Sequence, residues 1–248
     1  MRIGIVTALI CVALVAALAV RATAAEGKLR VLVVTGGHAF EREAFFAMFD
    51  SFEGVEWREV QHPQANDVYA PEQRDSYDVI VLYDIGQKIT EEQKANLLET
   101  LGRGKGLVVL HHALASYQEW PEYARLIGAK YMLSEQEFEG QKWARSTFKH
   151  GVDLKVHVAD PKHPITKGMK DFEIHDEAYG GYWVSPKAHP LLTVEHPESA
   201  KIVGWTNQYG KARVVCLQGG HDHLAYEDVD YRTLVQRAIL WAARRLGK

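Results

Sequence analysis

Histidines follow apolar segments at three separate places in this chain of 248 residues. His38 comes after LRVLVVT and two glycines, and the adjacent His111 and His112 come directly after LVVL. His221 comes after RVVCLQ and two more glycines. An imidazole can exchange a proton near pH 7 or bind a divalent metal ion. This placement predicts a reactive site assembled from distant parts of the chain.

Carboxylates and a tyrosine occur in similar settings. Asp84 directly follows the apolar segment of YDVIVLYD, and the stretch FEIHDEAYGG contains Asp176, Glu177 and Tyr179. Adjacent acids usually form a solvated turn, but in an aromatic context they suit binding of sugar hydroxyls or the positioning of a histidine. Glu177 is therefore a candidate partner for the histidines. The structural alternative is that each histidine is a buried residue satisfied by a backbone carbonyl.

The segments that precede these residues have the pattern of buried strands. Short runs rich in β-branched residues predict strands at residues 29–35, 55–60, 77–83 and 107–110. Helical spacing predicts one helix in EREAFFAMFDSF and another that starts at a capping box of Thr90 and Gln93. The alternation predicts an α/β fold with a mostly parallel sheet and helices on both faces. Because parallel strands share one carboxyl edge, we expect the histidines to converge there.

The second half of the sequence is less regular. Residues 131–190 carry turn signals and few long periodic segments, so we expect a long excursion beside the sheet. Two strands are expected around Gly210, in AKIVGWTNQYGKARVVCLQGG. A last helix is expected from about Tyr231 to Leu246, with five residues packed inward: Leu234, Val235, Ala238, Ile239 and Ala242.

The first 24 residues have the pattern of a secretory signal peptide. Arg2 precedes an almost continuous apolar run over residues 3–20, and the small residues of ATA follow at the spacing of a cleavage site. A membrane anchor is the alternative, since the run is of borderline length for a span. The small residues favour cleavage before Ala25 and a single domain over residues 25–248. We therefore expect export to the periplasm or the extracellular space, without stable membrane insertion.

Charge and cysteine content exclude some classes of protein. The formal charge is −3, and removal of residues 1–24 would make it −5, with 27 basic residues against 32 acidic ones. No basic stripe is present, so nucleic acid is not an expected partner. Cys216 would be the only remaining cysteine, which excludes an internal disulfide. A small molecule is the expected partner, and a homo-oligomer stays open.

Longer stretches of the sequence resemble the ThuA-like, or trehalose-utilisation, family, whose fold is that of class I glutamine amidotransferases. The resemblance rests on VVTGGHAFERE, YDVIVLYD, residues 88–131, HPITKGMKDFEIHDEAY, GKARVVCLQGGHDHLAY and RAILWAARR. It covers most of the chain from Leu29 to Arg245. It implies a flavodoxin-like, doubly wound sheet.

The resemblance also implies roles for His111 and His221. In the amidotransferases the corresponding strand leads to a cysteine nucleophile, and His111 stands at that position here. His221 corresponds to the catalytic histidine of that fold. Cys216 lies within a predicted strand and cannot replace the nucleophile, so glutaminase activity is not expected. The family's association with disaccharide use implies elimination, hydrolysis or isomerisation of (3-keto-)glycosides.

These reactions assign roles to the candidate residues. A ketone at C3 acidifies the hydrogen on C2, and a histidine can remove it as a general base. The developing enolate then needs a positive group, a hydrogen-bond donor or a metal. His111 is the expected base, with His221 and Glu177 as an acid or orienting pair. The other candidates would line the substrate site: His38, Asp84, His112, Asp176, Tyr179 and His223.

Three alternatives remain open. A divalent-metal hydrolase would use a three-histidine face with an open position, formed by His38, His111 and His221. A non-catalytic carbohydrate-binding protein would use aromatic stacking platforms, namely Trp120, Trp183 and Trp205. An inactive amidotransferase scaffold would serve as a partner-binding module. No cofactor other than a divalent metal is expected.

Overall fold

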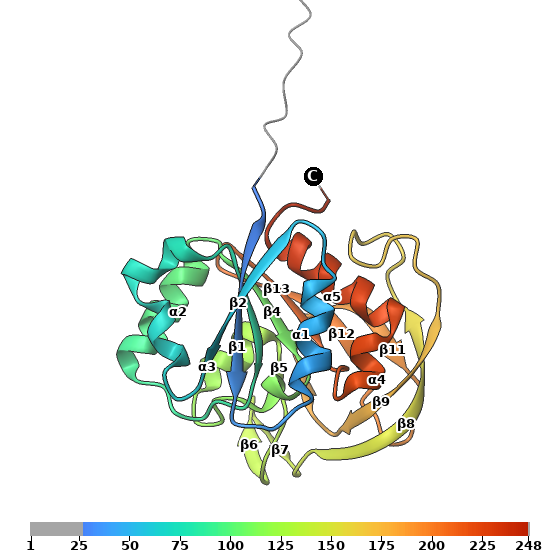
Figure 1. The fold of residues 1–248 in the computed structure, drawn as a ribbon. Helices are drawn as coiled ribbons and strands as arrows, with labels where there is room; N and C mark the ends of the chain where they lie inside the picture. The colour runs from blue at the N-terminus through green and yellow to red at the C-terminus, as the bar shows by residue number, and fades with distance from the viewer. Residues whose placement is uncertain (1–26, 248) are drawn as a thin grey trace, which may run out of the picture.

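The computed structural model describes residues 27–247 and gathers most strands into one nine-stranded sheet (Figure 1). The strand order is β2-β1-β3-β4-β13-β12-β11-β8-β9. In chain order the strands of this sheet are β1 (Leu29–Gly36), β2 (Val55–Gln61), β3 (Val79–Asp84), β4 (Gly106–Leu110), β8 (Thr147–Val158), β9 (Phe172–Gly180), β11 (His189–Val194), β12 (Ile202–Tyr209) and β13 (Ala212–Leu217). β2, β1, β3, β4 and β13 are parallel neighbours. β12, β11, β8 and β9 continue the sheet in antiparallel pairing.

Helices cover both faces of the parallel strands (Figure 1). On one face lie α1 (Arg42–Asp50), α4 (His223–Glu227) and α5 (Val229–Ala242), and on the other lie α2 (Glu91–Gly102) and α3 (Pro121–Ile127). The 3-10 helices are η1 (Ala65–Tyr69), η2 (Pro71–Ser76) and η3 (His111–Ala115). The flavodoxin-like, doubly wound α/β fold expected from the sequence is confirmed.

The apolar runs are continuous because each central strand is buried on both faces. Val31 and Val33 of β1 face α1 and α5, whereas Leu32 and Val34 face the opposite core. The same alternation divides β3 and β4 between the two cores. Such a strand has no polar side, which explains why these runs are the clearest signals in the sequence.

Helix boundaries follow the expected chemistry in two cases. The Thr90 side chain accepts a hydrogen bond from the Gln93 backbone N–H, and the Gln93 side chain accepts one from the Thr90 N–H, as a capping box requires. The last helix is α5, which begins earlier than expected, at Val229, and ends at Ala242. The five residues expected to face inward are all buried.

The structure corrects the interpretation of residues 131–190. This segment contributes β8 and β9, which extend the main sheet, in place of a loop-rich excursion beside it. It also contains the short strands β6 (Gln136–Phe138), β7 (Gln141–Trp143) and β10 (Trp183–Val184). β6 pairs with β7, and β10 pairs with β5 (Ala129–Lys130), which lies just before the segment, in two separate two-stranded sheets. Most residues of β8 are exposed, so the strand has no strong apolar period. The two strands expected around Gly210 are β12 and β13.

The expected signal peptide lies outside the described residues. Within residues 27–247, none of the helices has the length and apolar character needed to cross a membrane.

Candidate active site

The strand β4 ends in a sharp turn that presents His111 at the carboxyl edge of the sheet. His111 is the first residue of η3 and has a φ of 49°, a left-handed conformation that is uncommon for any residue except glycine. A strand-to-helix turn with a strained residue at its corner is the geometry of a nucleophile elbow. The resemblance to the amidotransferases therefore extends to the backbone, with an imidazole at the corner.

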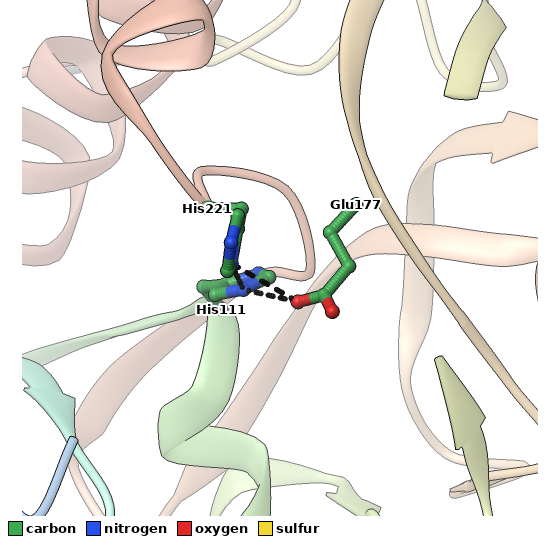
Figure 2. A group of neighbouring side chains, drawn as sticks. All are labelled: His111, Glu177 and His221. Carbon is green, nitrogen blue, oxygen red and sulfur yellow. Dashed lines mark hydrogen bonds and ion pairs between the residues drawn. The ribbon is translucent and has the colours of Figure 1, made fainter. Parts of the chain in front are cut away.

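Three side chains from separate elements meet at this turn (Figure 2). His111 Nε2 lies 3.0 Å from Glu177 Oε2 and 3.2 Å from His221 Nδ1, and His221 Nδ1 lies 3.1 Å from the same Glu177 oxygen. His111 comes from the end of β4, Glu177 from β9, and His221 from the turn after β13. We call these three residues the His–Glu–His cluster. The structure thus brings together the three residues that the sequence analysis gave catalytic roles.

The hydrogen bonds around His111 determine which atoms carry protons. Its Nδ1 lies 2.7 Å from the carbonyl oxygen of Gln218 and must donate to it. In an uncharged ring Nε2 then bears a lone pair, which faces the carboxylate of Glu177. Two acceptors 3.0 Å apart require a proton or a cation between them. Tyr179 Oη, 3.0 Å from His111 Nε2, is a further donor at this position.

Electrostatics around the cluster favour an anionic glutamate beside protonated imidazole. Burial by itself raises the pKa of Glu177, but hydrogen bonds from His111 and His221 outweigh it and hold that pKa well below its usual range. The hydrogen bond to Glu177 likewise raises the pKa of His221, against the opposing effect of burial. Burial and the nearby Glu177 raise the pKa of Tyr179 far above its usual value, so its hydroxyl keeps its proton.

A bulge between β8 and β9 directs a third imidazole toward the cluster. The register shifts between Lys149 and Val152, so His150 and Gly151 together oppose Glu177. Gly151 has a φ of 62°, which suits glycine at such a bulge. His150 Nδ1 lies 3.1 Å from Glu177 Oε1. The sequence analysis did not identify His150, because only the pairing of two strands that are distant in sequence brings it to the site.

Asp176 holds the backbone that carries His221. Its carboxylate accepts hydrogen bonds from the N–H groups of Gly220, at 2.7 Å, and His221, at 2.9 Å. Asp176 is buried, and this burial raises its pKa. Asp176 was expected to line the substrate site, but it is not among the residues that line the cavity beside the cluster. It orients the turn after β13 instead.

A cavity of about 190 Å³ opens beside the cluster. Glu177 and His221 line it, as do three residues expected to contact the substrate, namely His38, His112 and Tyr179. The sequence analysis did not identify the remaining lining residues: Ile85, Ala115, Tyr131, Leu133, Arg145, Phe148 and His150. Phe148 and Leu133 are exposed apolar side chains at this cavity.

Two other expected lining residues are elsewhere. Asp84 is fully buried, and its Oδ2 lies 2.8 Å from His62 Nε2 and accepts the Gly86 N–H, so it is enclosed beneath the site. His223 begins α4 and pairs with Glu41 on the surface. Asp84 and His223 both come at the carboxyl ends of strands, as expected. Their side chains pair with His62 and Glu41 and do not line the cavity.

The structure also changes the expected set of metal ligands. Among the described residues, the group whose ligand atoms all lie within 4.8 Å of one another is the His–Glu–His cluster. Glu177 thus takes the place expected for His38, which lines the cavity and stacks on His112 with ring centroids 4.8 Å apart. Imidazole nitrogen and carboxylate oxygen are ligands that zinc and related ions prefer.

Other residues considered for chemistry or binding belong to the core. Cys216 is fully buried within β13, and burial raises the pKa of its thiol well above the usual value, so it is no nucleophile. Trp205 is also fully buried and donates to the Ile127 carbonyl, and Trp120 is buried. Trp183 packs against a separate small core. The tryptophans therefore do not form stacking platforms at this cavity.

Fold and site together define a doubly wound α/β protein with an amidotransferase-like turn that carries histidine in place of cysteine. The family model for trehalose utilisation, ThuA, matches residues 30–242, so the chain belongs to the ThuA family.

Solved structures agree with this assignment. A ThuA-like protein from Parabacteroides merdae has a TM-score of 0.75 at 18% identity, over 89% of this chain and 92% of that one. One from Bacteroides uniformis has a TM-score of 0.67 at 18% identity, over 90% and 94%. A cytoplasmic protein from Salmonella typhimurium has a TM-score of 0.61 at 14% identity, over 89% and 100%. At such identities the likeness is one of fold. No curated protein matches the sequence.

Proposed function

We propose that the protein is an exported enzyme that acts on 3-keto-glycosides, or on closely related disaccharide derivatives, by proton transfer at His111. The observation that carries the proposal is the convergence of His111 Nε2, Glu177 Oε2 and His221 Nδ1 within 3.0–3.2 Å of one another beside a cavity. The description of the family, trehalose utilisation, supports a disaccharide-derived substrate.

The cluster contains the groups that this reaction needs. A ketone at C3 makes the C2 hydrogen acidic. His111 Nε2 can accept that proton when the hydroxyl of Tyr179, which lines the cavity, gives up its hydrogen bond to this nitrogen. Glu177 stabilises the imidazolium that forms, and the Gln218 carbonyl keeps the ring in the required tautomer. His221, whose pKa is raised, can donate a proton to the developing enolate or to the departing C1 oxygen.

The cavity fits a substrate of modest size. Its volume of about 190 Å³ is below the roughly 300–1,000 Å³ of sites that enclose drug-sized ligands. One sugar ring would fill the cavity, and a second ring would reach its mouth. There the exposed Phe148 offers an apolar face on which a sugar ring can stack.

The direct test uses the mature protein with 3-keto-trehalose and with unmodified trehalose, each with and without a chelator, and follows the products by mass spectrometry. Consumption of the keto sugar in the presence of chelator is the expected result. If neither sugar is consumed, the protein is not an enzyme of this class. Binding without turnover would then favour the non-catalytic alternative.

A second candidate function, a divalent-metal hydrolase, is favoured by the spacing of the same three atoms. Tetrahedral zinc with bonds of about 2.0–2.2 Å holds neighbouring ligand atoms about 3.3–3.5 Å apart. The observed separations of 3.0–3.2 Å need only a small outward movement. Three protein ligands with an open position facing a cavity are typical of catalytic zinc. Gln218 and His150 would orient two of these ligands from behind.

Titration with Co²⁺ separates the two candidates, because tetrahedral cobalt absorbs strongly in the visible range. If the cluster is a metal centre, the chelated protein should bind Co²⁺, and Glu177→Gln should weaken binding at least tenfold. Glu173→Gln is the matched control, since Glu173 lies on the same strand and pairs with Lys155 at the surface. Absence of Co²⁺ binding, together with activity in chelator, would exclude the metal candidate.

A further inference from the structure

His112 is a buried polar side chain whose two ring nitrogens make no hydrogen bond of normal geometry among the described residues, although the backbone of Tyr83 acts on the ring as a weak acceptor. It is only 3% exposed, yet it lines the cavity. Buried polar groups in folded proteins are nearly always hydrogen-bonded, and exceptions require an explanation. The neighbouring His111, by contrast, is hydrogen-bonded at both nitrogens.

The surroundings of His112 fix its ring in place. Tyr83 packs against it with ring centroids 4.3 Å apart, and the centroid of the His38 ring lies 4.8 Å away. An uncharged imidazole has one N–H donor and one lone pair. This is the complement of a hydroxyl group, which also donates and accepts.

His38 provides a second polar atom at the same cavity. Its Nδ1 lies 2.6 Å from the Ala39 carbonyl oxygen and donates to it, which leaves Nε2 as an acceptor when the ring is uncharged. Gly37 allows this arrangement, because a Cβ at that position would lie 2.4 Å from the Ile85 carbonyl oxygen. The loop after β1 can therefore pack closely on the loop after β3, with His38 beside the cavity.

We propose that His112, with His38 beside it, binds hydroxyl groups of the substrate. These hydroxyl groups would lie next to the carbon that reacts at the His–Glu–His cluster. The inference rests on the proposed function for the sugar class of the substrate, and it adds the residues that recognise it. The predicted ligand is a polyol or keto sugar, because a hydroxyl group, like an uncharged imidazole, both donates and accepts a hydrogen bond.

The test measures binding of 3-keto-trehalose by calorimetry in the His111→Gln background, where turnover does not consume the ligand. Adding His112→Phe keeps a ring of similar size but removes both nitrogens, and affinity should fall at least tenfold. Adding His112→Gln keeps an uncharged donor and acceptor, and affinity should fall less. His157→Phe is the control, because His157 lies at the surface on β8 and pairs with Asp171; its affinity should be unchanged.

A stability measurement separates recognition from a structural role. Replacing an unpartnered buried polar group by an apolar one is neutral or stabilising, so His112→Phe should unfold at the same temperature as the parent or higher. Equal affinity in the parent and His112→Phe would overturn the inference, as would equal losses in the Phe and Gln variants. If the His111→Gln parent itself does not bind the keto sugar, the sugar assignment fails, and the inference fails with it.

Discussion

The two nitrogens of His111 have different environments, and the proposed role of the residue as a base depends on this difference. Nδ1 is committed to the Gln218 carbonyl, whereas Nε2 faces a carboxylate oxygen at 3.0 Å. The ring is held in one tautomer by a backbone atom, so little reorganisation accompanies the arrival of a proton. Glu177 then faces a positive charge in place of a lone pair. In this arrangement a metal ion, if bound as in the second candidate function, would compete with a proton for the same atoms of the cluster.

Substitution of His111 tests its proposed role as the general base. His111→Gln keeps hydrogen bonding but removes the base, so turnover of the keto sugar should fall by about 10²–10⁴ while affinity stays within a few fold. Steady-state kinetics and calorimetry measure the two quantities. Under the metal-hydrolase candidate the same change would also reduce bound metal. A variant that is less stable but fully active would show that His111 is structural.

At the level of elements, β9 and the turn after β13 are coupled through one carboxylate. Asp176 lies in β9 beside Glu177, and its oxygens accept two backbone N–H groups of the turn that carries His221. A displacement of either element would therefore change the distance between Glu177 and His221. The bulge at Gly151 adds a similar coupling between β8 and β9.

Removing the Asp176 carboxylate should loosen the turn. Asp176→Ala leaves the N–H groups of Gly220 and His221 without an acceptor, so the free energy of unfolding should fall by about 2–4 kcal/mol and activity should fall with it. Asp176→Asn retains one acceptor oxygen and should lose less of both. Urea denaturation and kinetics measure these effects. Full stability and activity in the alanine variant would show that the turn is held by other contacts.

Across the whole molecule, the candidate site and the Arg30–Asp78 ion pair lie at opposite edges of the sheet. The cluster lies at the carboxyl edge, and Arg30 pairs with Asp78 at the amino ends of β1 and β3. Arg30 also donates its backbone N–H to the same carboxylate. Burial alone would raise the pKa of Asp78, but the hydrogen bonds from Arg30 outweigh it and lower that pKa.

This pair predicts a pH-dependent contribution to stability. A carboxyl whose pKa is lower in the folded state stabilises the protein above its unfolded pKa of about 3.9, and the contribution is lost as pH falls through the folded value. Asp78→Asn should therefore cost about 1 kcal/mol at pH 7, since the pair is partly exposed, and less below pH 4. Urea denaturation at pH 7 and pH 3 measures the change. A cost that is equal at both values would contradict the prediction.

Export is a further prediction for the whole chain. Residues 1–24 carry the signal-peptide pattern, so protein recovered from the cell envelope or the medium should begin at Ala25. Intact-mass measurement with N-terminal sequencing checks this. Recovery of the chain from the cytoplasm with Met1 or Arg2 at its start would remove the proposal of export.

Local patterns in the sequence were sufficient to predict the strands of the parallel half of the sheet. β1, β3 and β4 are apolar on both faces, so burial leaves an unbroken signal along each strand. The rule that ligands bind at the carboxyl ends of parallel strands then predicted a candidate site at that edge without any contact being known. This is why His38, His111 and His221 could be grouped, although they lie far apart in the chain.

The antiparallel extension and the fine geometry of the site depended on tertiary structure. β8 is mostly exposed and carries little periodic signal, so its pairing with β9, and the bulge that brings His150 to Glu177, were not readable from sequence. Asp84 and His223 follow the right strands but are held by His62 and Glu41.

Sequence by itself therefore determined which residue types stand at the carboxyl edge, because strand ends are set by local burial patterns. Tertiary structure decided which side chains meet within 3 Å, as His111 and Glu177 do, because that depends on register, turn geometry and neighbours contributed by distant segments.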